Sequence, residues 1–309
     1  MQGHREEHGV EPICAALKDT PAHVAPSTVH AWRGGREQSK RAKRDGELIE
    51  AIAGLRASSY CAYGSRKTWV ALNRGGLAVA RCTVERLMRA QGWSGLSKAK
   101  GPRTTTARAG IDYPADLVKR EFQADAPNRL WVADITYVRT FAGWVYVAFV
   151  MDMFSRRIVG WQASTSLHTD LALHALEQGL WVRARAGHDV TDLVHHSDRG
   201  VQYRAVRYTE RLAEADVVAS VGSKGDSYDN AAAEALNSTF KAELVRNQHV
   251  LAEHGPWRSI NDLEVAIAEW VDWYNHSRLH GSLGDIPPAE YETNYYAEHA
   301  PTALVGATP

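Results

Sequence analysis

The spacing of hydrophobic residues changes near residue 130, from helical periods before it to strand-like runs after it. In the front part, Val84, Leu87 and Met88 recur every three or four positions, which indicates one apolar helix face. After the change, runs rich in β-branched and aromatic residues occupy positions 130–140 and 144–154. The pattern therefore predicts a helical front followed by a region that contains strands.

The second region follows an α/β plan. A third strand is expected at 156–163, and three consecutive strands with short joins predict an antiparallel meander. Further elements are expected in the order helix, strand, helix, strand, helix, helix, at residues 170–185, 192–198, 207–215, 217–222, 230–245 and 261–276. This order predicts the α/β fold class with one mixed sheet.

A pair of short helices is the clearest feature of the front part. Residues 63–76 carry Trp69 and Leu72 and end at two glycines, and an arginine-bearing helix follows at 80–92. Two helices joined by a glycine turn are typical of a helix-turn-helix, which places its second helix in the major groove of DNA. A surface pair whose arginines face water is an equal alternative. The candidate DNA contacts are Arg66, Lys67, Arg81, Arg86 and Arg89.

Charge separates the two parts further. The chain has 36 basic and 36 acidic residues, but residues 1–110 hold 19 basic and 9 acidic ones. A basic front favours a polyanionic partner, and the acidic remainder suits carboxylates that hold cations. The polar, basic run that begins at Ser97 is expected to be a linker that can also touch phosphates.

Composition excludes several classes of protein. The 309 residues include 44% hydrophobic and 23% charged residues, as in ordinary globular proteins of about two domains. The longest uncharged apolar stretch, Ala142 to Met151, is far shorter than the roughly 20 residues of a membrane helix. The charged N-terminus is unlike a signal peptide, and Cys14, Cys61 and Cys82 are far apart. We therefore expect reduced thiols, no membrane partner and a cytoplasmic location.

Three acidic residues are candidates for chemistry. Asp134 lies inside the first strand, Asp198 ends the fourth, and Glu234 lies in the helix that follows the fifth. A carboxylate in a central strand is costly unless it is paired or bound to a metal, and α/β sheets assemble active sites at strand ends. Converging carboxylates select Mg²⁺ or Mn²⁺. Taken singly, Asp198 also fits a turn and Glu234 a solvated helix face.

Four sequence blocks carry a family resemblance. They are WVADITYV, HHSDRGVQY, GSKGDSYDNAAAEALNSTFKAEL and YNHSRLHGSLGDIPPAEY. Together they resemble the OrfB-type transposases of bacterial insertion sequences, which belong to the retroviral-integrase-like superfamily. The 35 residues between Asp198 and Glu234 match the separation in that family's Asp-Asp-Glu triad. The resemblance covers roughly residues 60–295 well and includes the helix pair at 63–96.

The resemblance implies a fold and a reaction. It implies a ribonuclease H-like core in which Asp134, Asp198 and Glu234 bind two Mg²⁺ (or Mn²⁺) ions. One ion would activate water or a 3′-hydroxyl, and the other would stabilise the leaving oxygen. The reactions would be DNA end cleavage and strand transfer, without a covalent enzyme intermediate. The implied partners are double-stranded transposon ends and target DNA, a homo-oligomer, and an upstream-frame product as a fusion or a partner.

Other residues are weaker candidates near the triad. Arg199 would position a phosphate or cap a strand end. Asn230, Glu234, Asn237 and Lys241 share one helix face, so we hypothesise that Asn230 and Lys241 touch the DNA end. Asp152, the pair His195-His196, and the pair His276/His280 are left outside the triad; the histidines are not expected to bind zinc, because neither a cysteine cluster nor an HExxH pattern is present.

These inferences divide the chain into four regions. The expected boundaries are 1–96 for the DNA-binding helices, 97–124 for the linker, 125–295 for the catalytic core and 296–309 for a tail. Two rival functions remain at this point. One is a DNA-binding regulator or decayed element product without catalysis, and the other is a ribonuclease H-like nuclease that cuts RNA–DNA hybrids.

Overall fold

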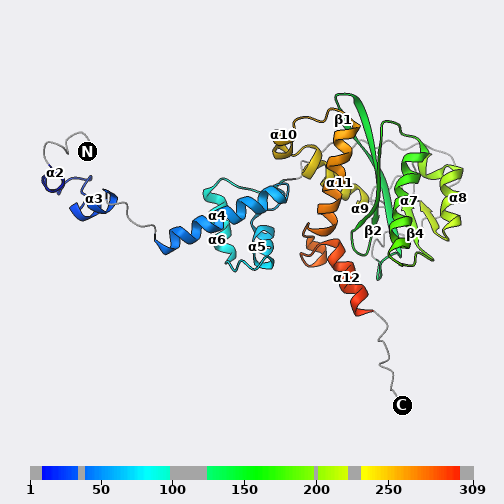
Figure 1. The fold of residues 1–309 in the computed structure, drawn as a ribbon, viewed down its shortest axis with the longest axis horizontal. Coiled ribbons are helices and arrows are strands. Elements are labelled where there is room, and N and C mark those ends of the chain that lie inside the picture. The colour runs from blue at the N-terminus through cyan, green and yellow to red at the C-terminus, as the bar shows by residue number, and fades with distance from the viewer. Residues whose placement is uncertain (1–8, 34–38, 98–123, 198–200, 222–230, 300–309) are drawn as a thin grey trace, which may run out of the picture. The chain divides into compact units, whose positions relative to one another are not determined.

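A computed structural model describes residues 9–33, 39–97, 124–197, 201–221 and 231–299 of the chain. It divides the protein into two compact units, residues 1–51 and residues 52–309 (Figure 1). The two units are described separately below. Within the described ranges, no helix is both long enough and apolar enough to cross a membrane.

The first unit contains two short helices, α2 (Val10–Ala16) and α3 (Pro26–Arg33). Their small core consists of Val10, Cys14 and Val29, which are buried and pack together. Helix α4 (Lys40–Ser58) begins in the first unit and ends in the second. Proline at the first position of α3 suits a helix start, because that position needs no backbone N–H donor.

The helix pair predicted near 63–96 is present as α5 (Ser65–Arg74) and α6 (Arg81–Ala90). The expected apolar face of α6 is confirmed, since its three residues Val84, Leu87 and Met88 are all buried. The turn between the helices contains Gly76 with φ of +83°, a left-handed conformation that glycine adopts at little cost.

The predicted mixed sheet is confirmed, with strand order β3-β2-β1-β4-β5. The antiparallel meander is formed by β1 (Leu130–Thr140), β2 (Gly143–Asp152) and β3 (Ile158–Ser164). Strands β4 (Val194–Ser197) and β5 (Val218–Val221) run parallel to β1 and to each other. The parallel pairing of β4 covers only the first third of β1 and ends where Ala133 pairs with Ser197.

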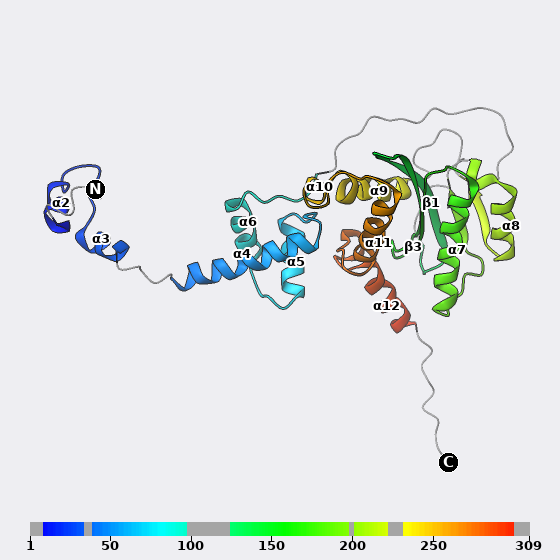
Figure 2. The same ribbon diagram turned by 45° about the horizontal axis from the view of Figure 1, so that its top comes forward.

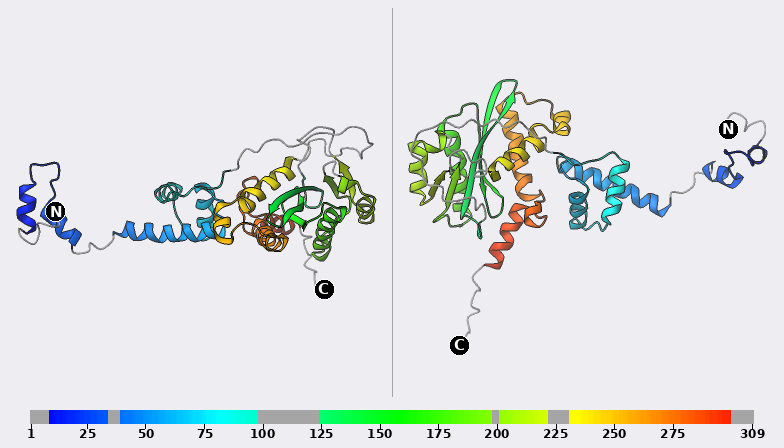
Figure 3. Two further views of the ribbon diagram at one scale, coloured as in Figure 1. Left: turned by 90° about the horizontal axis from the view of Figure 1, so that it is seen from above. Right: turned by 180° about the vertical axis from the view of Figure 1, so that it is seen from behind.

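Helices cover both faces of this sheet (Figures 2 and 3). On one side lie α7 (Thr169–Arg185) and α8 (Val206–Glu214), over a core that includes Trp131 and Leu176. On the other side lie α9 (Ala231–Phe240) and α11 (Ile260–His276), over a core that includes Phe149 and Trp270. Alternate residues of β1 therefore enter two different cores, as the two-residue period of a strand requires.

The C-terminal part differs from the expected plan in three places. A helix was expected to continue to residue 245, but α9 ends at Phe240 and a π-helical turn, η2, spans Lys241–Val245. The hydrophobic pattern also does not predict α10 (Gln248–His254) or α12 (Pro288–Glu298). The described residues also contain two short 3₁₀ turns, η1 (Val201–Arg204) and η3 (Gly281–Leu283).

A buried ion cluster explains how a polar helix such as α12 can pack on the core. Arg183 of α7 donates to both carboxylate oxygens of Glu292 on α12, at 2.6 and 2.8 Å, and to Asp152 of β2 at 3.2 Å. The three side chains are at most 2% exposed. Hydrogen bonds and charge from Arg183 overcome burial and lower the pKa of Glu292 to about 2. The cluster ties three elements together through charge instead of apolar periodicity.

Strand β3 and helix α7 approach each other closely at Gly160. A Cβ atom at this position would lie 1.9 Å from the carbonyl oxygen of Ala175 and 3.0 Å from the nitrogen of Gly179. Backbone atoms of a packed helix cannot move aside as a flexible side chain can. We expect Gly160→Ala to destabilise the protein by about 1–3 kcal/mol or more, measured by chemical denaturation.

Gly54→Ala provides the control for this prediction. A Cβ atom at Gly54, inside α4, would meet nothing within 4 Å. Alanine in a helix interior is favoured over glycine by roughly 0.5–1 kcal/mol, so this variant is expected to gain stability slightly. Equal stability of the two variants would contradict the close approach at Gly160.

Candidate active site and DNA-binding helices

Asp134 lies in β1 at the point where the parallel pairing with β4 stops. Its side chain is partly buried. One carboxylate oxygen, Oδ1, accepts a hydrogen bond from the backbone N–H of Ile135 at 2.9 Å. The other, Oδ2, accepts one from the side-chain amide of Asn237 at 2.9 Å. A strand and a helix that are far apart in the sequence therefore fix the orientation of this carboxylate together.

Helix α9 presents two different faces. Its apolar face carries Leu236 and Phe240, which are buried, and Leu244 of the following π turn η2 is buried as well. The ring of Phe240 packs edge-to-face on Phe149 and Trp270, with centroids 5.1 and 5.3 Å apart. These contacts fix the rotation of the helix and direct its polar face toward Asp134.

The polar face of α9 carries Glu234 and Asn237. Glu234 is exposed, and it precedes Asn237 by three residues, so both lie on the same side of the helix. Because Asn237 bonds directly to Asp134, Glu234 lies one helical turn from that contact. The structure thus brings the elements that carry Asp134 and Glu234 together, as the sequence predicts.

Three of the predicted site residues, Asp198, Arg199 and Asn230, lie outside the described residues. The residue before Asp198 is described: Ser197 of β4 pairs with Ala133 of β1, the residue before Asp134. Within the described ranges, no three histidine, cysteine, aspartate or glutamate side chains are placed to hold a metal ion. Asp198 lies outside those ranges, so the three acidic residues predicted as a triad are not all within them.

The donor set fits a hard divalent cation. Carboxylate oxygens are the ligands that Mg²⁺ prefers. Asn237 adds a second indication, because its side-chain oxygen is buried and has no hydrogen-bond partner among the described residues. A buried polar atom of this kind usually has a partner, and water or an ion can supply it.

Lys241 follows on the same face of the helix, at the start of the π turn η2. Its ammonium group lies 4.6 Å from the ring centroid of Tyr137. Partial burial and the charge of Arg246 lower the pKa of Lys241, while the charge of Asp134 raises it. π-Helical turns often mark functional sites, and this one places a cation close to the candidate catalytic carboxylate.

The cations of α5 are engaged within the second unit. Arg66 donates to both carboxylate oxygens of Asp285, one of them at 3.1 Å, and Lys67 donates to the backbone carbonyl of Leu279 at 2.8 Å. Burial lowers the pKa of Lys67 to about 8. Whether these two residues also touch DNA stays a prediction.

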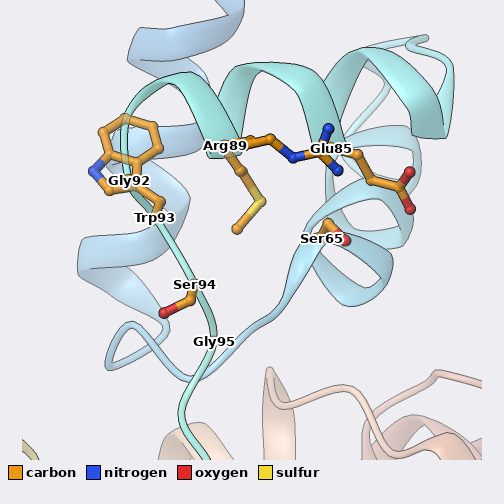
Figure 4. Close-up of a pocket in the computed structure, with 8 residues that line it drawn as sticks. Ser65, Glu85, Arg89, Gly92, Trp93, Ser94 and Gly95 are labelled. Atoms are coloured by element: carbon orange, nitrogen blue, oxygen red, sulfur yellow. The ribbon is translucent and has the colours of Figure 1, made fainter.

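The arginines of α6 are more exposed. Arg81 pairs with Glu85 one turn later in the helix, at 2.8 Å, and Arg86 and Arg89 are both exposed. Figure 4 shows Arg89 and Glu85 beside a shallow pocket of about 640 Å³. The pocket is lined by Ser65, Glu85, Met88, Arg89, Gly92, Trp93, Ser94 and Gly95. Basic side chains on the second helix suit a DNA-binding role, which the structure does not test.

The remaining candidates have contacts within the protein. Asp152 accepts hydrogen bonds from the backbone of Asn128 and Phe154 and belongs to the buried ion cluster. His195 is buried beside the Tyr208 hydroxyl at 3.1 Å, and burial lowers its pKa to about 4. His196 lies 3.0 Å from the Ser220 hydroxyl.

The last two histidines lie in the C-terminal segment. His276 lies 2.9 Å from Asp272, and His280 is buried beside Tyr274 and Arg278. Arg278 itself pairs with Glu243 of the π turn at 2.6 Å.

Sequence reasoning missed the role of Asn237. The helical spacing places it on the face of Glu234, but nothing in the sequence indicates its bond to Asp134, which is 103 residues away. The exposed aromatic side chains of Tyr137 and Trp144 were also missed. Strand alternation was the available signal, since both residues occupy the face of the β1–β2 hairpin opposite to Val138 and Val145.

Comparisons with known proteins agree with this arrangement. Residues 124–227 and residues 215–288 match two families described as the integrase core domain, and residues 43–101 match an HTH-like domain. A solved structure of the HTLV-2 integrase catalytic core domain in complex with magnesium is 14% identical. It covers 54% of this chain and 98% of its own, with a TM-score of 0.43. The fold and the family matches define an integrase-core protein with a helix-turn-helix-like region.

Two curated relatives narrow this class. A putative transposase for insertion sequence element IS986/IS6110 of Mycobacterium tuberculosis is 51% identical over 276 residues, which are 89% of this chain and 97% of that protein. The transposase for insertion sequence element IS629 of Shigella sonnei is 45% identical over 297 residues, which are 95% and 94%. The chain belongs to the OrfB-type transposases of insertion sequences. It is accordingly a DNA transposase, a polynucleotidyl transferase.

Proposed function

We propose that Asp134, Asp198 and Glu234 form the catalytic triad with which this transposase cuts transposon ends and joins them to target DNA. The observation that carries this proposal is the hydrogen bond from Asn237 to Asp134, which fixes the helix of Glu234 against β1. The pairing of Ser197 with Ala133 supports the inclusion of Asp198, since each of these residues directly precedes one of the two aspartates.

The triad would hold two Mg²⁺ or Mn²⁺ ions. When bound, such ions activate the attacking oxygen and stabilise the leaving oxygen of an in-line displacement at phosphorus. The chain's own residues prepare the site: Asn237 and the N–H of Ile135 each occupy one oxygen of Asp134 and hold its carboxylate in one orientation. Each carboxylate oxygen has a further lone pair, so these bonds do not exclude a metal ligand role.

Asn237 is a positioning residue in this proposal. We expect Asn237→Ala to raise the Mg²⁺ concentration required for half-maximal cleavage by about 10- to 100-fold, because outer partners orient metal ligands. Cleavage at saturating Mg²⁺ should recover most of its rate. Ser238→Ala, an exposed neighbour on α9, is the matched control and should leave the Mg²⁺ requirement unchanged. A lower rate at every Mg²⁺ concentration with an unchanged requirement would contradict the positioning role.

DNA binding is assigned to two surfaces. The helices α5 and α6 would recognise the transposon end, with Arg81, Arg86 and Arg89 on the second helix near the groove. Lys241 and Asn230 would contact the DNA end beside the triad, and Arg199 a phosphate near Asp198. Loss of a phosphate contact in Lys241→Ala should reduce both the affinity for the end and its salt dependence.

The assembly is also part of the proposal. Two DNA ends must be held together for joining, so we infer a homo-oligomer in the bacterial cytoplasm, with an upstream-frame product as a fusion or a partner. The expected division of labour is a DNA-binding region at 1–96, a linker at 97–124, a core at 125–295 and a tail at 296–309. The helix α12 extends to Glu298, which is three residues past the expected end of the core at residue 295.

The test is cleavage of an oligonucleotide that carries the element's ends, with Mg²⁺, Mn²⁺, Ca²⁺ or EDTA. We expect nicking and strand joining with Mg²⁺ and Mn²⁺ that Asp198→Asn abolishes. DNA binding without metal-dependent nicking would favour a regulator. Cleavage of RNA–DNA hybrids alone, without joining, would favour a ribonuclease H-like nuclease. Either result would overturn the proposal.

A further inference from the structure

Four side chains form an aromatic and cationic patch beside the candidate active site. Two are the exposed rings of Tyr137 and Trp144, which are 49% and 46% exposed, and two are the cations Arg139 and Lys241. The rings meet edge-to-face with centroids 5.3 Å apart. The guanidinium of Arg139 lies 5.2 Å from the Trp144 ring, and the ammonium of Lys241 lies 4.6 Å from the Tyr137 ring.

The β1–β2 hairpin holds this patch rigidly. Arg139 pairs with Trp144 in the antiparallel register, and the alternate positions Val138 and Val145 are buried in the core on the opposite face. The tip of the hairpin is also held in place, because the N–H of Phe141 donates a hydrogen bond to the carbonyl of Trp257 at 3.0 Å. The two aromatic rings are therefore exposed on a rigid hairpin. Packing within the protein does not explain their exposure, and exposed apolar groups that cluster often mark a binding site.

The patch adjoins the carboxylate at which cleavage is proposed. Tyr137 follows Asp134 by three residues along β1, so the two side chains leave opposite faces of the strand, and Lys241, 4.6 Å from the Tyr137 ring, connects them. Lys241 follows Asn237, the hydrogen-bond partner of Asp134, by one helical turn. Burial and the charge of Arg246 lower the pKa of Lys241, and the charge of Asp134 opposes this shift, which agrees with the proximity of Lys241 and Asp134. The patch therefore lies along β1 from Asp134, with Trp144 opposite Arg139, five residues or roughly 17 Å further on, so a ligand on the patch would be a few nucleotides from the reacting phosphodiester.

We propose that the patch binds an unpaired nucleotide of the DNA strand at the cleavage site, with the base stacked on Tyr137 or Trp144. Arg139 and Lys241 would contact the flanking phosphates. Bases inside a duplex have both faces covered, so only an unpaired base can stack on a protein ring. The combination of exposed rings and cations is the chemistry that binds single-stranded nucleic acid. This inference rests on the proposed function, since it assigns the substrate's local form at the same site.

The test compares two fluorescent DNA probes by anisotropy, with EDTA present so that cleavage cannot occur. One probe is a blunt duplex of about 20 base pairs, and the other is the same duplex with a 3′ tail of about five thymidines. We expect the full-length wild-type chain to prefer the tailed probe. Tyr137→Ala and Trp144→Ala should each weaken tailed-probe binding by about tenfold and change blunt-probe binding by less than about twofold.

Matched variants separate stacking from other effects. Trp144→Phe keeps an aromatic face and should retain most of the preference for the tail. Trp181→Ala removes another exposed tryptophan, which lies on α7 and has its own cation, Arg185, 5.4 Å away. This variant should bind both probes as the wild type does. Arg139→Gln should reduce the salt dependence of tailed-probe binding.

Three results would overturn the inference. The first is equal affinity of the wild type for the two probes. The second is an equal loss of affinity for both probes in Trp144→Ala, which would indicate a general effect on folding or charge. The third is a change of oligomeric state in Trp144→Ala, measured by sedimentation, without a change in tail preference, which would identify the patch as a protein interface.

The outcome is independent of the proposed triad, because the binding assay contains no divalent cation. Stacking without metal-dependent cleavage would disprove the proposed function and support the patch. Metal-dependent cleavage with no role for the two rings would disprove the patch and leave the triad intact.

Discussion

Asp134→Asn is expected to lower Mg²⁺-dependent cleavage and strand transfer by about 10³-fold or more, which amounts to roughly 4 kcal/mol of transition-state stabilisation. Asparagine keeps the shape of the side chain, but it removes one negative charge from the proposed metal site. The amide oxygen of the new side chain can still accept from the N–H of Ile135, and its NH₂ group can donate to Oδ1 of Asn237 once that amide turns over, so the fold should survive. Single-turnover cleavage of a labelled transposon end gives the rate, and the melting temperature verifies folding.

Asp216→Asn is the matched control for this substitution. Asp216 is exposed and has a φ of +54°, a conformation that asparagine also tolerates, so activity and stability should both be unchanged. Retention of more than about a tenth of the wild-type rate by Asp134→Asn would refute its role as a metal ligand.

Arg183→Met is expected to destabilise the protein by about 3–5 kcal/mol, because it leaves the buried Asp152 without its cation and leaves Glu292 with Arg157 as its remaining ion-pair partner, at 2.8 Å. Arg183 supplies two of the hydrogen bonds to Glu292 and one to Asp152. Methionine fills much of the same space, so the expected loss comes from unpaired charge and not from a cavity. The free energy of unfolding, measured in urea at neutral pH, tests the prediction.

Two variants separate the effect of pairing from that of side-chain removal. Arg185→Met, two residues along the same helix and exposed, should change stability by less than about 0.5 kcal/mol. Adding Glu292→Leu to Arg183→Met should recover part of the lost stability, since it removes a buried carboxylate whose remaining cation, Arg157, is 23% exposed and can be solvated. Asp152 retains hydrogen bonds from Asn128, Trp131 and Phe154 in that double variant. A further loss in the double variant would mean that charge pairing is not the main contribution.

The sequence predicts the sheet well because its strands satisfy local rules. The span 130–140 expected for the first strand is that of β1, and the burial of Val84, Leu87 and Met88 follows the helical period of α6. Local periodicity reports which side of an element is buried. It therefore also places Glu234 and Asn237 on one helix face, and the second of these residues bonds to Asp134.

The parts that the sequence does not predict depend on partners far along the chain. Helix α12 has few apolar residues at helical spacing, and its buried contact is the charged Glu292, which periodicity assigns to solvent. Arg66 looks like a surface cation in sequence, yet its partner Asp285 is 219 residues away. Asp152 looks like a possible site residue and instead belongs to a structural ion cluster.

The pairing of α5 with the C-terminal segment has a consequence for the energetics of DNA binding. Arg66 is held by Asp285, and Arg74 is held by Glu290 on α12. A backbone phosphate that contacted either guanidinium would compete with a carboxylate of the same chain. The number of condensed counterions released on binding is then smaller than the basic charge of α5 indicates. Internal competition of this kind would make α5 less adhesive toward arbitrary DNA than its composition implies.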